Sequence, residues 1–211
     1  MDRHVEPHFD SAALITIDMQ HDTLDGQPLE VPGTSAIVTN LGALCTAFRR
    51  AGRPIVHIVR LYQADGSNAD ASRRSLIETG AAILRPGSPG SQLASGLGPD
   101  ASVLDHERLL AGEVQSIGER EVVIFKPRWG AFYRTPLHAH LRASGVDSLA
   151  FGGCNFPNCP RTSIYEASER DYRLVLVRDA VSGLYERGEQ ELVGIGVQVL
   201  AGHEVLSRLG R

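Results

Sequence analysis

The chain has little cysteine, and its first residues do not show the pattern expected of a leader. Its 211 residues include three cysteines, one tryptophan and two methionines. An odd number of cysteines, behind a first stretch (MDRHVEPHFD) without the apolar core of a secretory signal, argues against a disulfide framework. We therefore expect a protein of a reducing compartment, the cytoplasm.

An excess of positive charge is also missing, as is any long apolar run. Lys and Arg total 21 against 25 Asp and Glu, so the formal net charge is −4 and no basic surface for nucleic acid or anionic lipid is expected. The longest apolar stretch, LVGIGVQVLAG (192–202), is too short for a bilayer and is interrupted by glycines. The 42% hydrophobic content suffices for one domain with a full core, residues 1–211.

Short apolar or β-branched runs alternate with helical patterns along the chain. The strands are expected at 12–19, 54–60, 121–127, 147–153, 173–180 and 203–207, and the helices at 35–52, 135–145, 159–171 and 186–202. This alternation is typical of a parallel sheet that is covered on both faces. The sequence therefore predicts an α/β protein with a three-layer, doubly wound (Rossmann-like) fold around a six-stranded, mainly parallel sheet.

Residues 61–102 interrupt this alternation. They are rich in Gly, Ser, Asp and Pro, as expected of a long loop insertion over the surface. Such a segment in a compact domain is usually functional. We expect it to lie on the substrate side or to contact another subunit.

Three chemically capable residues fall at or just after the carboxyl ends of predicted strands. Asp18 ends the first strand, Lys126 ends the third, and Cys159 follows the fourth. Each residue also has a purely structural interpretation. Asp18 fits a turn cap, Lys126 a solvated charge at a strand end, and Cys159 a small buried residue. Ligands in open α/β sheets bind at this edge, so the coincidence of the three favours a joint functional interpretation.

The chemistry of this trio is that of a cysteine nucleophile. Pro160 marks a helix start at Cys159, and a helix N-terminus with a nearby cation lowers the pKa of a thiol. We expect Lys126 to stabilise the thiolate, and Asp18 to take the thiol proton and pass it to a leaving amine.

The stretch GGCNFPNCPRTS (152–163) places two cysteines five residues apart. Taken alone, Cys154 and Cys159 are compatible with a disulfide, with half of a metal site, or with one nucleophile beside a bystander. No second pair follows this C-x₄-C spacing, so a structural zinc site is poorly supported. Cys45, in contrast, lies on the apolar stripe of the helix expected at 35–52 and is interpreted as a core residue.

Four segments together resemble the isochorismatase-like hydrolase superfamily: ITIDMQ, KPRWGAFYRTPLHAHLRASGV, GGCNFPNCPRTSIYEA and VLVRDAVSG. The resemblance is to its cysteine hydrolase branch, which includes nicotinamidases, N-carbamoylsarcosine amidase and ureidoacrylate amidohydrolase. It implies a catalytic triad of Asp18, Lys126 and Cys159, and an oxyanion hole made by the backbone N–H groups of Asn155 and Cys159. It also implies a cis peptide between Cys154 and Asn155, and makes Cys154 a neighbour that shapes the loop.

The expected substrate pocket draws on residues near these motifs. Trp129, Phe132 and Tyr133 are candidates for its walls, although Phe132 also fits the core. Arg60 and Tyr62 are candidates for contact with a polar or anionic group of the substrate. An equally good interpretation makes Arg60 a surface cation and Tyr62 a packing aromatic. The full set of candidate substrate-binding residues is Gln20, Arg60, Tyr62, Trp129, Phe132, Tyr133, Asn155 and Phe156.

We expect no metal and no cofactor. Nicotinamidases of this family hold a metal with an Asp/His cluster near the second strand. The corresponding stretch here, RLYQADGSNADASRR, contains no histidine. His57 lies within the expected strand and is interpreted as a core or edge residue. The predicted function is a cysteine-dependent amidohydrolase that cleaves a C–N bond of a small amide, lactam or ureido substrate through a thioester. The alternatives are an isochorismatase-type vinyl ether hydrolase and a catalytically inactive binding or oligomer subunit. A homo-oligomer (dimer or tetramer) is expected, with no nucleic-acid or membrane partner.

Overall fold

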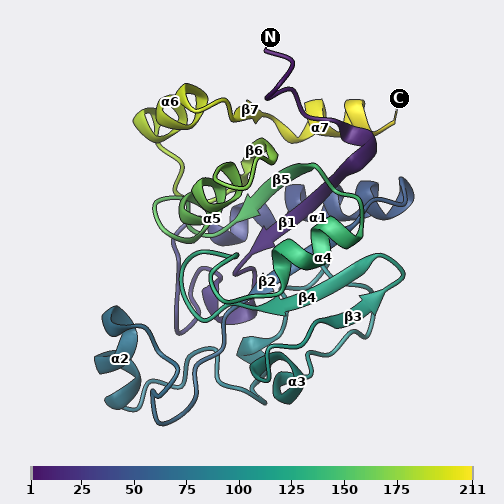
Figure 1. Ribbon diagram of the computed structural model, residues 1–211. Coiled ribbons are helices and arrows are strands. Elements are labelled where there is room, and N and C mark those ends of the chain that lie inside the picture. The colour runs from purple at the N-terminus through teal and green to yellow at the C-terminus, as the bar shows by residue number, and fades with distance from the viewer. Residues whose placement is uncertain (1, 211) are drawn as a thin grey trace.

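A computed structural model describes residues 2–210 and places a seven-stranded sheet at their centre (Figure 1). The strands are β1 (Ala12–Ile17), β2 (Ile55–Val59), β3 (Gln115–Gly118), β4 (Glu121–Phe125), β5 (Ser148–Gly153), β6 (Arg173–Val181) and β7 (Gln198–Leu200). Their order is β3-β4-β2-β1-β5-β6-β7, and all neighbours are parallel except β3 and β4. The three-layer α/β fold is confirmed, with seven strands instead of six.

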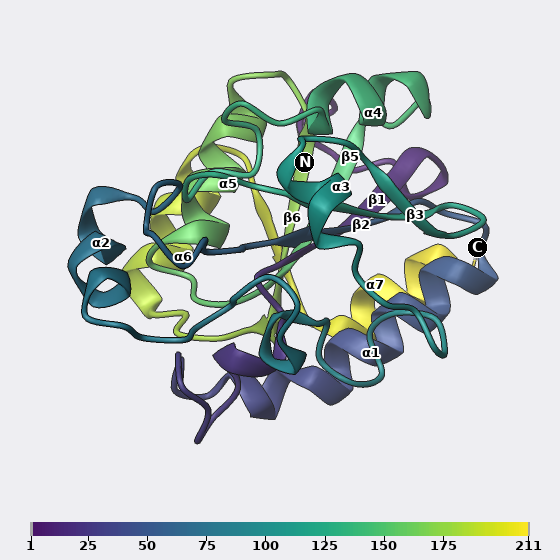
Figure 2. The ribbon, with the colours of Figure 1, turned by 90° about the horizontal axis from the view of Figure 1, so that it is seen from below.

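Helices cover both faces of this sheet (Figure 2). They are α1 (Thr34–Arg50), α2 (Ala71–Glu78), α3 (His106–Leu110), α4 (Leu137–Ala143), α5 (Cys159–Ser168), α6 (Glu186–Gly194) and α7 (Gly202–Leu209), with short 3₁₀ turns at Phe9–Ser11, His21–Thr23 and Pro89–Ser91. Apolar side chains of α4, α5 and α6 pack on one face, and those of α1 and α7 on the other. No helix within 2–210 has the length and apolar character that crossing a membrane requires.

The central strand and the first helix show why these segments fold as they do. Every residue of β1 is buried, as expected of a strand covered on both faces. In α1 the residues at helical spacing are buried against the sheet, among them Leu41, Cys45 and Phe48. The core position predicted for Cys45 is confirmed.

The C-terminal segment differs from the prediction. The helix expected at 186–202 ends at Gly194, because the chain turns at Gly196, whose φ of +87° suits glycine, and then forms β7. The strand expected at 203–207 is wrong, since α7 occupies these residues. This helix begins where the Gly202 N–H donates to Asp179 at 2.7 Å and the Ala201 N–H donates to Glu204 at 2.7 Å.

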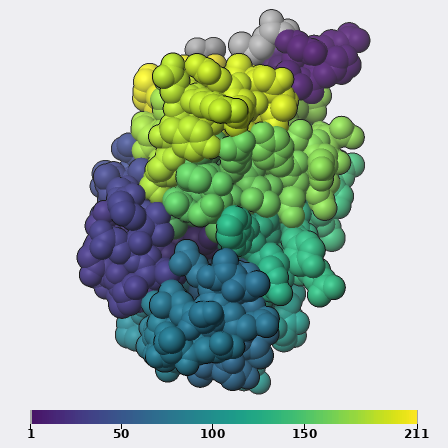
Figure 3. Space-filling view, turned by 90° about the vertical axis from the view of Figure 1, so that its left-hand side faces the viewer, coloured from purple at the N-terminus to yellow at the C-terminus, as the bar shows by residue number. Residues whose placement is uncertain are grey.

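The insertion at 61–102 contains ordered structure that the sequence pattern did not indicate. It includes α2 and a small apolar cluster in which Ile77 packs with Tyr62 and Leu84. In the space-filling view this segment, in blue, forms a lobe at the end of the molecule opposite the C-terminal helices (Figure 3). Beyond it, β3 was missed because it is a four-residue antiparallel edge strand.

The strand order creates a topological switch point beside β1. From β1 the chain proceeds to β2 and β4 on one side, and β5, β6 and β7 follow on the other. The loops that leave the carboxyl ends of β1 and β5 therefore diverge and open a crevice between them.

Candidate active site

The carboxyl ends of β4, β1 and β5, at one edge of the sheet, position the predicted catalytic residues. Asp18 directly follows β1 and its N–H donates to Ile58 at 2.9 Å, while Lys126 directly follows β4 and its N–H donates to Val59 at 3.0 Å. Cys159 is the first residue of α5, in the loop after β5, with Pro160 in the first turn as expected.

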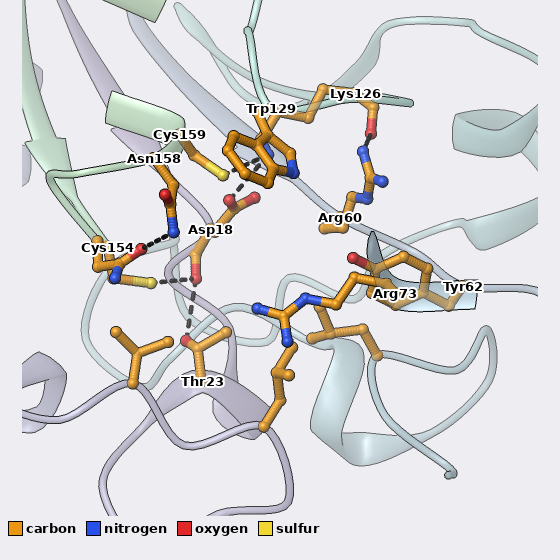
Figure 4. Close-up of a pocket in the computed structure, with 14 residues that line it drawn as sticks. Asp18, Thr23, Arg60, Tyr62, Arg73, Lys126, Trp129, Cys154, Asn158 and Cys159 are labelled. Atoms are coloured by element: carbon orange, nitrogen blue, oxygen red, sulfur yellow. Dashed lines mark hydrogen bonds and ion pairs between the residues drawn. The ribbon is translucent and has the colours of Figure 1, made fainter. Parts of the chain in front are cut away.

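The side chains of these three residues meet (Figure 4). The Lys126 ammonium lies 2.8 Å from Asp18 Oδ2 and donates to Cys159 Sγ at 3.3 Å and to the Arg128 carbonyl at 3.3 Å. Lys126 is 1% exposed and Asp18 7% exposed, while Cys159 is partly exposed. The other carboxylate oxygen, Asp18 Oδ1, is buried and has no hydrogen-bond partner among residues 2–210, so it remains available to accept a proton.

Asp18 also has an unusual backbone conformation. Its φ of +53° lies in the left-handed region, which an aspartate adopts more readily than most residues but still at a cost of about 1 kcal/mol. Strain of this kind persists where the surroundings enforce it, and here the Asp18 carbonyl accepts the hydroxyl of Thr23 at 3.0 Å and the thiol of Cys154 at 3.2 Å. The turn therefore holds the carboxylate toward Lys126.

The charges around the thiol act in opposite directions. Burial lowers the pKa of the Lys126 ammonium, but the Asp18 carboxylate and Cys159 outweigh burial, and the net shift is upward. Burial, followed by the charge of Asp18, raises the pKa of the Cys159 thiol to about 12, and Lys126 opposes this rise only in part. The expectation of a lowered thiol pKa is therefore wrong, because it counted Lys126 and the helix N-terminus but not burial and the adjacent carboxylate.

The loop from Gly153 to Cys159 depends on a close backbone approach. Gly153 has a φ of +121°, and a Cβ atom there would lie 2.2 Å from the Ile17 carbonyl oxygen, so only glycine fits. The Cys154 N–H then donates to Ile17 at 2.9 Å. The cis peptide implied for Cys154–Asn155 is wrong, since residues 2–210 contain no cis peptide bond.

Two backbone N–H groups of this loop stay free. In the described chain, the N–H groups of Asn155 and Cys159 donate to no other residue, whereas those of Phe156 and Asn158 are bonded to Ser182 and Asn155. The free pair is the one predicted as an oxyanion hole.

A small cavity of about 70 Å³ lies over the three catalytic candidates. Of the predicted pocket residues, Arg60, Tyr62, Trp129 and Asn155 line it. Residues that sequence reasoning missed also line it, namely Thr23, Leu29, Val31, Arg73, Leu84, Cys154 and Asn158. Most of these come from the loop after β1 or from the insertion, where no periodic pattern predicts the direction of a side chain.

Four predicted pocket residues do not line the cavity, and their assignment is corrected. Gln20 is fully buried and ties Arg60 to Ser91, donating to their carbonyls at 2.9 and 2.6 Å. Phe132 packs against Tyr172 in the core, and Phe156, also in the core, stacks edge-on against Tyr185. Tyr133 is 45% exposed on the surface.

Arg60 lines the cavity but is held by the protein itself. Its guanidinium pairs with Asp70, donates to the Lys126 carbonyl at 3.1 Å, and lies 5.0 Å from the centre of the Tyr62 ring. The Asp70 carboxylate comes from the residue before α2, so this pair fastens the insertion to the strand ends.

Among residues 2–210, no histidine lines the cavity. His57 is fully buried between Thr16 and Glu121, with ring nitrogens at 2.8 and 2.7 Å from their oxygens, which confirms the interpretation as a core histidine. Over the part of the chain that the structure describes, no three His, Cys, Asp or Glu residues cluster in a way that holds a metal ion.

Comparison with known proteins agrees with the fold. Residues 12–201 match the family model described as the isochorismatase domain. A protein of Arabidopsis thaliana named probable inactive nicotinamidase is 29% identical over 203 residues, covering 92% of this chain and 94% of the relative. Maleamate amidohydrolase of Pseudomonas putida is 29% identical over 177 residues, covering 80% and 71%.

A crystal structure shows the same relationship in three dimensions. An isochorismatase family protein from Desulfovibrio vulgaris superimposes with a TM-score of 0.81 at 32% identity, covering 95% of this chain and 99% of the other. Since the family model spans the chain from β1 to the residue after β7 and the folds agree, the chain belongs to the isochorismatase-like hydrolase family.

Proposed function

We propose that this chain is a cysteine-dependent amidohydrolase that cleaves the C–N bond of a small carboxamide, lactam or ureido substrate. The observation that carries the proposal is the contact of the Cys159 thiol, the Lys126 ammonium and the Asp18 carboxylate at one side of a cavity. A nucleophile, a base and a cation in mutual reach are the groups that acyl transfer requires. The amidohydrolase name of the Pseudomonas relative supports the same reaction class.

Asp18 acts as the base in the first half of the reaction. Because the pKa of Cys159 is about 12, the resting thiol is protonated, and its proton passes to Asp18 as sulfur bonds to the substrate carbonyl carbon. Asp18 Oδ1 is the oxygen without a partner and so takes the proton, while Oδ2 stays with Lys126. Lys126 stabilises the negative charge as it moves from the carboxylate toward sulfur and the substrate oxygen.

The free N–H groups of Asn155 and Cys159 receive the oxyanion of the tetrahedral intermediate. When that intermediate collapses, the C–N bond breaks, Asp18 returns its proton to the departing nitrogen, and a thioester remains on Cys159. Water then adds to the thioester with Asp18 again as the base. The C–S bond breaks, the acid leaves, and the proton returns to the thiol.

The size of the cavity sets the scale of the substrate. A space of about 70 Å³ is well below that of sites for drug-sized ligands, which are typically about 300–1,000 Å³. Trp129, 41% exposed, offers a flat apolar face at the edge of this space. The site is therefore suited to a substrate of few non-hydrogen atoms.

One alternative is favoured by a specific observation. The Arabidopsis relative is named probable inactive nicotinamidase, so a member of this family without turnover on the same scaffold is a second candidate. This alternative predicts that the protein hydrolyses no amide, although Asp18, Lys126 and Cys159 are all present.

A panel of small carboxamides, lactams and ureido acids tests the proposal through release of ammonia or acid. The wild-type protein and Cys45→Ala, which removes a core thiol, should turn over at least one substrate, and Cys159→Ser should turn over none. Intact-mass measurement after acid quench should show an acyl adduct on the wild-type protein. Hydrolysis that persists in Cys159→Ser would exclude the thiol mechanism, and no turnover across the panel would favour the inactive alternative.

A further inference from the structure

Four charged side chains line the cavity, and three of them are already neutralised by the protein. Asp18 and Lys126 form one ion pair at 2.8 Å, and Arg60 forms another with Asp70, which lies just behind the lining. The fourth is Arg73 from α2. The cavity therefore carries one positive charge in excess, and Arg73 supplies it.

The Arg73 guanidinium has no direct bonding partner in the described chain, which leaves its N–H groups available to a ligand. Within residues 2–210 its guanidinium makes no hydrogen bond, ion pair or ring contact, and Figure 4 shows it pointing into the cavity. Asp70 lies one helical turn away, but its Oδ2 accepts from Arg60 and its Oδ1 from the Ser72 hydroxyl at 2.6 Å. Against the effect of burial, the charge of Arg73 helps to lower the pKa of Asp70, but both oxygens of that carboxylate already accept hydrogen bonds from other side chains.

The lining of the cavity favours an ion pair between Arg73, which is partly exposed, and a ligand. Leu29, Val31 and Leu84 supply apolar lining to the same cavity. Apolar walls lower the local dielectric and strengthen the attraction between a guanidinium and an anion that displaces water from it. An exposed arginine on a solvated helix face has no such walls, and Arg74, the next residue, is of that kind because it is exposed and lies outside the cavity.

We infer that Arg73 binds a carboxylate of the substrate, so that the preferred substrates are short amides or ureides that also carry an acid group. This inference rests on the proposed function for the bond that is cleaved and adds the part of the substrate that is recognised. A guanidinium matches a carboxylate with two parallel N–H···O bonds, which fixes the orientation as well as the affinity of the ligand. With its acid on Arg73, a short substrate presents its amide carbonyl toward Cys159 and the free N–H groups of Asn155 and Cys159.

The test compares acids with neutral amides of the same shape. Succinamate and N-carbamoylglycine are measured against succinamide and N-carbamoylglycinamide, in which a carboxamide replaces the carboxylate. The wild-type kcat/KM should be about ten- to hundredfold higher for the acids, the range expected for a hydrogen-bonded charge. Arg73→Ala should remove this preference through a higher KM for the acids, with little change for the neutral amides, and Arg73→Lys should retain part of it.

Arg74→Ala is the matched control, since it removes the same charge from the same helix outside the cavity, and it should keep the wild-type preference. Equal loss on acids and neutral amides in Arg73→Ala, or no loss on either, would overturn the role of Arg73 while leaving the amidohydrolase proposal intact.

A binding measurement tests the role of Arg73 even if no amide is hydrolysed and the proposed function fails. Calorimetry with succinamate should then show binding to the wild-type protein that weakens at least tenfold in Arg73→Ala and not in Arg74→Ala. Equal affinity for all three proteins, or no binding to the wild type, would overturn the inference.

Discussion

Replacement of Asp18 by asparagine should make the Cys159 thiol more acidic and at the same time abolish turnover. The side chain keeps its shape but loses its charge and its ability to take a proton. Asp18 is the second cause, after burial, of the raised pKa of Cys159, and Lys126 at 3.3 Å from the sulfur opposes both. Without the carboxylate, the Lys126 ammonium has the thiolate as its remaining anionic partner.

The size of the effect follows from the loss of one adjacent negative charge. Such a charge typically shifts a pKa by about 1–3, so the pKa of Cys159 should fall from about 12 to about 10. At pH 8 the thiolate fraction then rises about a hundredfold. A less basic thiolate is a weaker nucleophile, and a Brønsted slope of about 0.4–0.5 cancels about tenfold of this gain. The rate of alkylation of Cys159 should therefore increase about tenfold.

Two measurements check this prediction. Iodoacetamide labelling at pH 8 gives the rate at Cys159, and thiolate ultraviolet absorbance gives the titration, with Cys159→Ser as the baseline for the other two cysteines. Ammonia release measures turnover on the same samples. Slower labelling of Asp18→Asn, with its titration moved to higher pH, would refute the reasoning, because Asp18 would then be promoting ionisation of the resting thiol.

Three further outcomes are expected. Lys126→Met leaves the Asp18 carboxylate buried without its partner, so the free energy of unfolding in urea should fall by about 3–5 kcal/mol, and adding Asp18→Asn should restore much of it; an unchanged midpoint would contradict the pairing. Cys154 is 2% exposed, its pKa is raised by burial, and its thiol donates to the Asp18 carbonyl, so peptide mapping should find it labelled after Cys159; earlier labelling would reverse their roles. Activity should survive dialysis against EDTA, with nicotinamide a poor substrate, because no metal-holding cluster of His, Cys, Asp or Glu lies in residues 2–210; a tightly bound stoichiometric metal that is needed for turnover would disprove this.

The strand-end residues were predictable from the sequence because parallel strands present their carboxyl ends at one edge. Asp18 and Lys126 each follow a short apolar run that folds as a buried strand, and Pro160 marks the helix that begins at Cys159. These local patterns suffice to bring the three residues together once the strand order is known.

The lining of the pocket and the pKa of the Cys159 thiol were harder to predict from the sequence, since both depend on how the loops pack. Phe156 faces the core instead of the cavity, and Arg73 enters the cavity from an insertion without an apolar pattern that predicts its helix. The raised pKa of Cys159 depends on burial and on its proximity to Asp18, and neither quantity is visible in a linear pattern. The edge strand β3 and the turn at Gly196 were not predicted for a related reason, because segments of four residues or fewer show too little periodicity.

The guanidinium of Arg60 has a consequence for engineering. It joins Asp70, in the insertion, to the backbone carbonyl of Lys126, so the insertion and the strand end that carries Lys126 share one point of attachment. A chimaera that receives a foreign 61–102 segment should keep its catalytic geometry only if an acid remains at position 70 to meet Arg60. Transplants that respect this junction should exchange selectivity alone, and those that cut through it should lose turnover on every substrate.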